Sequence, residues 1–113
     1  MIKIYHNPRC LKSRQGLEAI ENSGKEFEIV KYLDQVPSEK EVSEIINLLD
    51  ISPIELVRKN EKVWKENYKG KELSDEEIIK VMIENPKLIE RPIVINGEKA
   101  AIGRPLENIT SIL

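Results

Sequence analysis

Cys10 is the residue best suited to chemistry in this 113-residue sequence, and it is the only cysteine. It lies between a short strand-like segment and a predicted helix. Amide groups at a helix N-terminus carry a partial positive charge, which favours the thiolate over the thiol. His6, Arg9, Lys12 and Arg14 add cationic or polarisable groups nearby in the sequence. Because the thiolate is the form that attacks electrophiles, this pattern predicts a nucleophile whose thiol pKa lies below roughly 8.5.

The alternative for Cys10 is a buried structural thiol, which is a common fate of free cysteine. Its position between a strand and a helix, with cations on both sides, favours the nucleophile. Ser13 lies three residues further on, where its hydroxyl could donate to the sulfur or cap the helix. Since there is no second cysteine, no internal disulfide can form, and an external thiol must release any group that Cys10 acquires.

The elements around Cys10 form a strand-helix-strand unit in the N-terminal third. Ile2 and Ile4 alternate with polar residues in a short strand, a helix is predicted from Ser13 to about Ser23, and a second strand covers residues 27–33. Gly24 is the expected C-terminal stop of the helix.

The middle of the chain is predicted to be helical. A capping box at residues 38–41 precedes apolar residues at positions 42, 45, 46 and 49, the spacing of an amphipathic helix. A second capping box at 52–55 opens a short helix that ends near Arg58, and a third at 74–77 opens a helix that stops at Asn85-Pro86. Residues 60–71 carry no pattern that assigns them to an element.

The C-terminal part predicts a hairpin followed by a helix. Residues 93–95 and 99–102 flank Asn96-Gly97, a signal for a type I′ turn, and Pro105 starts a last helix. The order β-α-β, helical middle, β-β-α resembles the thioredoxin fold. We therefore expect an α/β protein with a central mixed four-stranded sheet. A helical insertion separates the N-terminal βαβ unit from the C-terminal ββα unit, all in a single domain over residues 1–113.

Composition excludes several classes of function. Hydrophobic residues make up 40% of the chain and charged residues 34%, with a net charge of −2 and no basic stripe. Neither nucleic acid nor an anionic membrane is therefore an expected partner. The N-terminus lacks the apolar run of a signal peptide, and no stretch approaches the roughly 20 apolar residues of a membrane span. No cluster has zinc-ligand spacing, so no metal is expected. We expect a cytoplasmic protein.

Four segments, in order along the chain, carry a resemblance to a known family. The loop Tyr5-His6-Asn7-Pro8-Arg9-Cys10-Leu11-Lys12-Ser13-Arg14 resembles the active-site loop of the glutaredoxin-dependent arsenate reductases. Residues 56–60, 90–94 and 102–105 resemble three further motifs of that family. The resemblance runs from Ile2 to the last predicted helix.

The resemblance implies a reaction and a set of residues. Cys10 would attack arsenate to form a covalent adduct, glutathione would add, glutaredoxin would reduce the mixed species, and arsenite would leave. His6 resembles the family histidine that helps to keep the thiolate ionised, although a plain turn histidine is an equal alternative. Arginine offers a planar fork of donors suited to oxyanions. The residues implied to hold the oxyanion are Arg58, Arg91, Arg104 and Ser13, with Asn7, Arg14 and Pro92 in support.

Further expectations follow from the same resemblance. The Arg91-Pro92 peptide should be cis, and the protein should be a monomer with no bound cofactor, glutathione serving as co-substrate. Arg9, Leu11 and Lys12 are larger and more basic than the small residues common beside the family cysteine. Two alternatives stay open. One is an Spx-like regulator that binds RNA polymerase, although Ser13 stands where its Cys-x-x-Cys switch needs a second cysteine. The other is a member of the family that keeps the fold but has lost activity or acts on a different thiol substrate.

Overall fold

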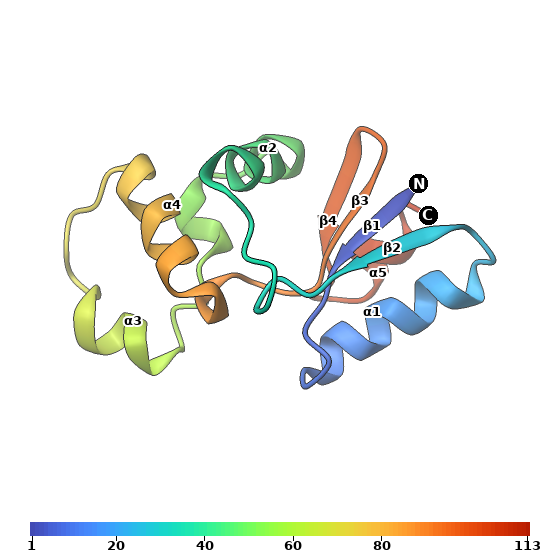
Figure 1. Cartoon of the computed structure of the whole chain (residues 1–113), viewed down its shortest axis with the longest axis horizontal. Coiled ribbons are helices and arrows are strands. Elements are labelled where there is room, and N and C mark those ends of the chain that lie inside the picture. The colour runs from blue at the N-terminus through green and yellow to red at the C-terminus, as the bar shows by residue number, and fades with distance from the viewer. The chain divides into compact units, whose positions relative to one another are not determined.

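The computed structural model describes residues 1–113, which pack into two compact units. The sheet unit contains Met1–Gln35 and Arg91–Leu113, and the helical unit contains Val36–Glu90. Figure 1 shows the elements of each unit along the colour gradient. The sheet unit consists of β1 (Ile2–Tyr5), α1 (Leu11–Asn22), β2 (Phe27–Val30), β3 (Ile93–Asn96), β4 (Lys99–Ile102) and α5 (Glu107–Thr110). The prediction of a single domain over residues 1–113 stays a prediction.

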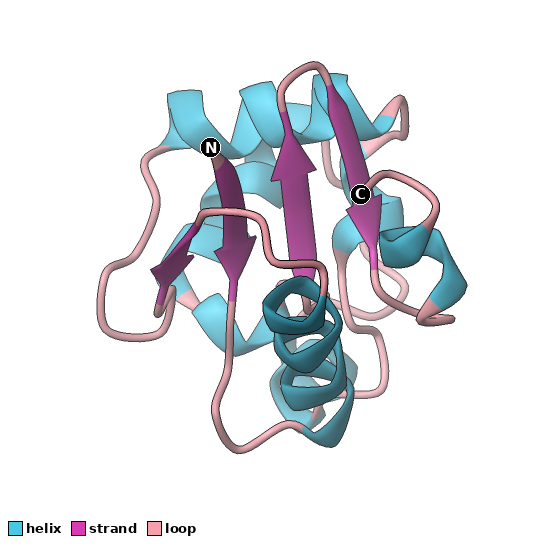
Figure 2. Cartoon of the chain, turned by 90° about the vertical axis from the view of Figure 1, so that its right-hand side faces the viewer, coloured by secondary structure: helices cyan, strands magenta, loops and turns pink.

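The four strands form one mixed sheet in the order β2-β1-β3-β4 (Figure 2). β1 pairs in parallel with β2, so that Ile4 lies opposite Ile29, and antiparallel with β3, where Ile4 lies opposite Val94. β3 and β4 form the antiparallel hairpin. The β-α-β and β-β-α units therefore meet at the β1–β3 pair, and the predicted thioredoxin-like α/β fold is confirmed.

One apolar core holds the sheet unit together. Alternation along β1 directs Ile2 and Ile4 to the same face of the sheet, where both are buried in one cluster with Ile20 of α1, Val94 of β3 and Ile109 of α5. The two helices α1 and α5 thus cover the same face. Burial of each such side chain contributes about 1.5–3 kcal/mol, so this cluster fixes the C-terminal half of α1 against the sheet.

Three element boundaries differ from the predicted ones. α5 begins at Glu107 rather than Pro105. α1 begins at Leu11 rather than Ser13, because Cys10 itself adopts the extended conformation of an N-cap residue, with φ −95° and ψ 123°. β2 ends at Val30 rather than Leu33. The chain turns there, since the Lys31 carbonyl accepts hydrogen bonds from the backbone N–H groups of Asp34 and Gln35.

The predicted hairpin is confirmed, but its predicted type I′ turn is wrong. Asn96 pairs with Lys99, which leaves Gly97 and Glu98 in the loop. Gly97 has φ 65°, whereas Glu98 is not among the residues with positive φ. A type I′ turn requires positive φ at both central residues, whereas glycine at the first one alone is typical of type II′.

The helical unit follows the predicted capping signals. The N-cap residue of α2 (Glu39–Leu49) is Ser38, whose hydroxyl accepts a hydrogen bond from the Glu41 backbone N–H at 3.1 Å. The N-cap residue of α4 (Asp75–Glu84) is Ser74, which forms a complete capping box with Glu77. Residues 60–71, unassigned from the sequence, contain α3 (Lys62–Asn67), which buries Trp64. Two 3₁₀ turns, η1 (Pro53–Leu56) and η2 (Pro86–Leu88), complete the unit. No helix of the chain has the length and apolar content needed to cross a bilayer.

Candidate active site

Hydrogen bonds to its own backbone groups hold the loop that carries Cys10. The Asn7 carbonyl accepts a hydrogen bond from the Cys10 backbone N–H at 3.0 Å, and the Asn7 side-chain oxygen accepts one from the Arg9 backbone N–H at 3.0 Å. The Arg14 guanidinium donates to the Pro8 carbonyl at 3.1 Å. Asparagine favours such turns because its side chain can satisfy the backbone two residues on. These bonds place Cys10 at the first turn of α1.

Ser13 and His6 connect the end of β1 to the same turn of α1. The Ser13 hydroxyl oxygen accepts a hydrogen bond from the Asn7 backbone N–H at 2.9 Å and lies 2.7 Å from His6 Nδ1. Ser13 is fully buried and His6 is 5% exposed. Buried polar groups require such partners, because an unsatisfied one costs about 1–3 kcal/mol. The hydroxyl of Ser13 is therefore engaged inside the loop, and its part in substrate binding stays a prediction.

The surroundings of His6 favour the neutral form of its imidazole. Burial lowers the pKa of its imidazole, and the positive charges of Lys31 and Arg14 lower it further, while its hydrogen bond with Ser13 acts in the opposite direction. Desolvation disfavours the charged form of a histidine. The contact of His6 with the cysteine loop runs through Ser13, so His6 orients the first turn of α1 as a neutral ring.

Two arginines approach the sulfur of Cys10 from the far end of the chain. Arg104 Nη2 donates to Cys10 Sγ at 3.3 Å, and Arg104 Nε donates to the Arg91 carbonyl at 2.9 Å. The Arg91 side chain also hydrogen-bonds the sulfur. The Arg91-Pro92 peptide is cis, as predicted, and so is Arg104-Pro105. The site therefore has two guanidinium groups within reach of one thiol.

These groups give the half-buried Cys10 thiol a pKa below its ordinary value. Burial by itself raises the pKa. The opposing effects are a hydrogen bond from the Ser13 backbone N–H, the side-chain hydrogen bond of Arg91, and the charges of Arg104 and Arg91, which together outweigh burial. Ser13 is the third residue of α1, so its N–H is one of the backbone donors at the helix N-terminus that have no partner within the helix.

Two glycines that the sequence analysis did not single out allow the arginines to come this close. Gly103 precedes Arg104, and its backbone N–H donates to the Pro92 carbonyl at 2.9 Å. A Cβ on Gly103 would lie 2.4 Å from Ile109 Cδ1 and 2.8 Å from Pro92 Cγ, and one on Gly16 of α1 would lie 2.9 Å from both atoms. The one available signal was the position of Gly103 directly before an arginine-proline pair.

Arg58 belongs to the helical unit. Its guanidinium forms ion pairs with Glu61 at 3.4 Å and Glu90 at 3.1 Å. Its backbone N–H donates to the Leu88 carbonyl at 2.7 Å, beside the bridge between Val57 and Ile89. These contacts account for its position in the helical unit, and its part in oxyanion binding stays a prediction.

The arrangement around Cys10 suits covalent chemistry on a tetrahedral oxyanion. A thiolate supplies the nucleophile, and two arginine forks offer charge-assisted hydrogen bonds to oxygen atoms close to it. No group of three His, Cys, Asp or Glu side chains is placed to hold a metal ion. The chemistry that these residues support is therefore nucleophilic attack by sulfur next to bound anionic oxygen.

Comparison with known proteins places the chain in a family. Residues 5–112 match the sequence profile of the ArsC family. An arsenate reductase of Neisseria meningitidis is 41% identical over 114 residues, covering 99% of this chain and 97% of that protein. An arsenate reductase of Haemophilus influenzae is 43% identical, and the match covers 97% of each chain. A solved arsenate reductase structure from Vibrio cholerae has a TM-score of 0.93 at 40% identity, covering 99% of this chain and 97% of that one. The chain therefore belongs to the ArsC family.

Proposed function

We propose that this protein is a cytoplasmic, monomeric arsenate reductase that uses glutathione and glutaredoxin as external thiols. The main support is the contact between Arg104 and the Cys10 sulfur, with Arg91 beside it. It puts two guanidinium groups that can bind an oxyanion next to the nucleophile. The relatives that carry the name arsenate reductase support arsenate as the substrate. Arg58 is the third proposed ligand of the oxyanion, by resemblance to the family.

The first step is attack of the Cys10 thiolate on arsenic. A sulfur–arsenic bond forms, an arsenic–oxygen bond breaks, and the oxygen leaves as water after protonation. Arg91 and Arg104 stabilise the charge on the remaining oxygens, a kind of electrostatic stabilisation that typically supplies about 3–4 kcal/mol per donor. Arsenic is still pentavalent in this adduct.

Two external thiols then complete the reduction. The first displaces another oxygen from arsenic as water and forms a second sulfur–arsenic bond. The second attacks the sulfur of that bond, so a disulfide forms and the electron pair stays on arsenic, which becomes trivalent. Water finally releases arsenite and restores the Cys10 thiolate. Cys10 is the only cysteine, so both electrons must come from external thiols.

A coupled assay tests the proposal. Arsenate, glutathione, glutaredoxin, glutathione reductase and NADPH are mixed with the protein, and NADPH oxidation is followed by absorbance. We expect turnover that requires both thiol donors and disappears in Cys10→Ser, and the adduct in which arsenic joins Cys10 to one glutathione should be trappable for mass spectrometry. Absence of turnover, together with recovery of RNA polymerase in a pull-down, would instead favour the Spx-like alternative.

A further inference from the structure

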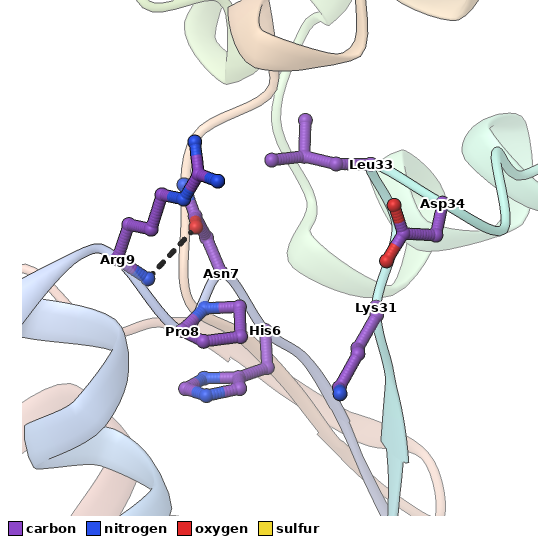
Figure 3. Close-up of a pocket in the computed structure, with 7 residues that line it drawn as sticks. All are labelled: His6, Asn7, Pro8, Arg9, Lys31, Leu33 and Asp34. Carbon is purple, nitrogen blue, oxygen red and sulfur yellow. Dashed lines mark hydrogen bonds between the residues drawn. The ribbon is translucent and has the colours of Figure 1, made fainter.

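A pocket of about 400 Å³ adjoins the cysteine loop, apart from the arginine pair. Figure 3 shows two segments facing each other across it: residues 6–9, which directly precede Cys10, and residues 31–34, which follow β2. A volume of this size falls within the range of small-ligand pockets, which is roughly 300–1,000 Å³. The pocket belongs entirely to the sheet unit, and its lining residues are His6, Asn7, Pro8, Arg9, Lys31, Leu33 and Asp34.

The charges around this pocket lack partners within the chain. Arg9 and Lys31 stand on opposite sides, and Asp34 lies next to Lys31 (Figure 3). The ion pairs of Arg58, Lys62 and Lys80 involve none of these three residues. Two unpaired cations and one unpaired carboxylate match a ligand that carries at least two anionic groups and one cationic group.

The position of the pocket indicates what such a ligand would do. Arg9 directly precedes Cys10 in the chain, and its backbone N–H donates a hydrogen bond to Asn7 Oδ1 at 3.0 Å. The arsenic bound to Cys10 can be reduced only with thiols from outside, because the chain holds no second cysteine. A thiol that docks here lies beside the segment that carries the reacting sulfur.

We propose that this pocket is the docking site of the thiol co-substrate, a small peptide thiol with two carboxylates and one amine. Arg9 and Lys31 bind the carboxylates, Asp34 binds the ammonium group, and Leu33 and Pro8 contact the apolar parts. The docked thiol sulfur bonds to the arsenic on Cys10 and displaces one oxygen, which takes the thiol proton and leaves as water. The inference rests on the proposed reductase function, which supplies that adduct.

Binding can be measured without turnover, because His6 is the only histidine and lines the pocket. The probe is S-methylglutathione, whose capped sulfur cannot react, and its titration is followed by NMR of the His6 ring. Lys31, Arg14 and Ser13 are the groups that act on this imidazole. A carboxylate bound at Lys31 offsets the charge of that lysine, so we expect saturable shifts and a higher His6 pKa in the complex.

Variants identify the residues that hold the probe. Because Arg9 and Lys31 are exposed, Arg9→Gln and Lys31→Gln should each weaken binding about two- to five-fold. Asp34→Asn should weaken binding of S-methylglutathione but not of its N-acetyl form, which lacks the ammonium group. Lys12→Gln is the matched control, since Lys12 is an exposed cation near Cys10 that does not line the pocket, and it should leave the affinity unchanged.

The outcomes separate this inference from the proposed function. Arsenate turnover with no effect of the probe on His6, or with Lys31→Gln binding as well as Lys12→Gln, would overturn the docking site and leave the reductase intact. Sulfate that shifts His6 as strongly as the probe does at equal ionic strength would also overturn it, in favour of a general anion site. Probe binding that depends on Arg9, Lys31 and Asp34, in a protein without arsenate turnover, would support the site and refute the reductase.

Discussion

Gly103→Ala should weaken the fold and the thiolate together. The added Cβ would lie 2.4 Å from Ile109 Cδ1 and 2.8 Å from Pro92 Cγ, both closer than carbon atoms approach in proteins. Ile109 and Pro92 are both fully buried, so neither side chain has room to move away from the added Cβ. Overpacking of this kind costs about 1–3 kcal/mol. The Gly103 backbone does not adopt positive φ, so this cost comes from packing alone.

The same substitution should move Arg104 away from Cys10. Gly103 and Arg104 are adjacent, and the Arg104 guanidinium contacts the sulfur at 3.3 Å. Relief of the clash shifts this segment and lengthens that contact. Loss of a nearby positive charge raises the pKa of a thiol, so the thiolate fraction at neutral pH should fall.

Two measurements check this reasoning. Urea unfolding should show a midpoint lowered by roughly 1 M, from about 2 kcal/mol divided by an m-value of about 1–3 kcal/mol/M. Iodoacetamide alkylation against pH should show a raised midpoint for Cys10. Ile109→Val removes the closest atom, so the double variant Gly103→Ala/Ile109→Val should lose less stability than the sum of the single variants.

A control separates the two effects. Gly24 has φ 73° and open space around it, so Gly24→Ala should lower stability by backbone strain and leave the alkylation profile unchanged. If Gly103→Ala matches the natural protein in both urea midpoint and alkylation profile, the argument that Gly103 positions Arg104 is refuted.

Four further predictions concern single sites. Arg104→Gln and Arg91→Gln should each raise the Cys10 pKa and lower arsenate turnover about ten- to a hundred-fold, with lysine rescuing only part of it, as kinetics and alkylation will show. Arg58→Ala should lower turnover more than stability, and unchanged kinetics would remove Arg58 from the site. The folded-state pKa of His6 lies below its ordinary value of 6.5, so the unfolded chain binds the proton more readily. Stability should therefore fall as pH drops below about 6.5, and less so in His6→Gln, as measured by urea unfolding at several pH values. Asp50 ends α2 with φ 55°, so Asp50→Gly should raise the melting temperature by relieving about 0.5–1 kcal/mol of strain.

Local signals in the sequence account for most of the secondary structure. The serine caps of α2 and α4 were predicted from residues that lie three apart, because the hydrogen bonds of a capping box join only those neighbours. The role of Cys10 as the nucleophile was also predicted from a local signal, because Cys10 directly precedes α1 in the sequence. The turn type after Asn96 was mispredicted because register, decided by pairing between β3 and β4, shifted the loop by one residue.

The tertiary structure decided what surrounds the sulfur. Arg104 lies 94 residues from Cys10 in the chain, and no pattern of spacing could show that its guanidinium reaches Sγ. That contact depends on Gly103 and Gly16 leaving room around Pro92, a condition of packing between α1, α5 and the hairpin. The neutrality of His6 likewise follows from burial, which depends on the whole sheet unit. The sequence by itself determined the type of chemistry, because residue identity and helix capping are local properties. The pKa values and distances that make this chemistry work depend on groups that only the folded chain brings together.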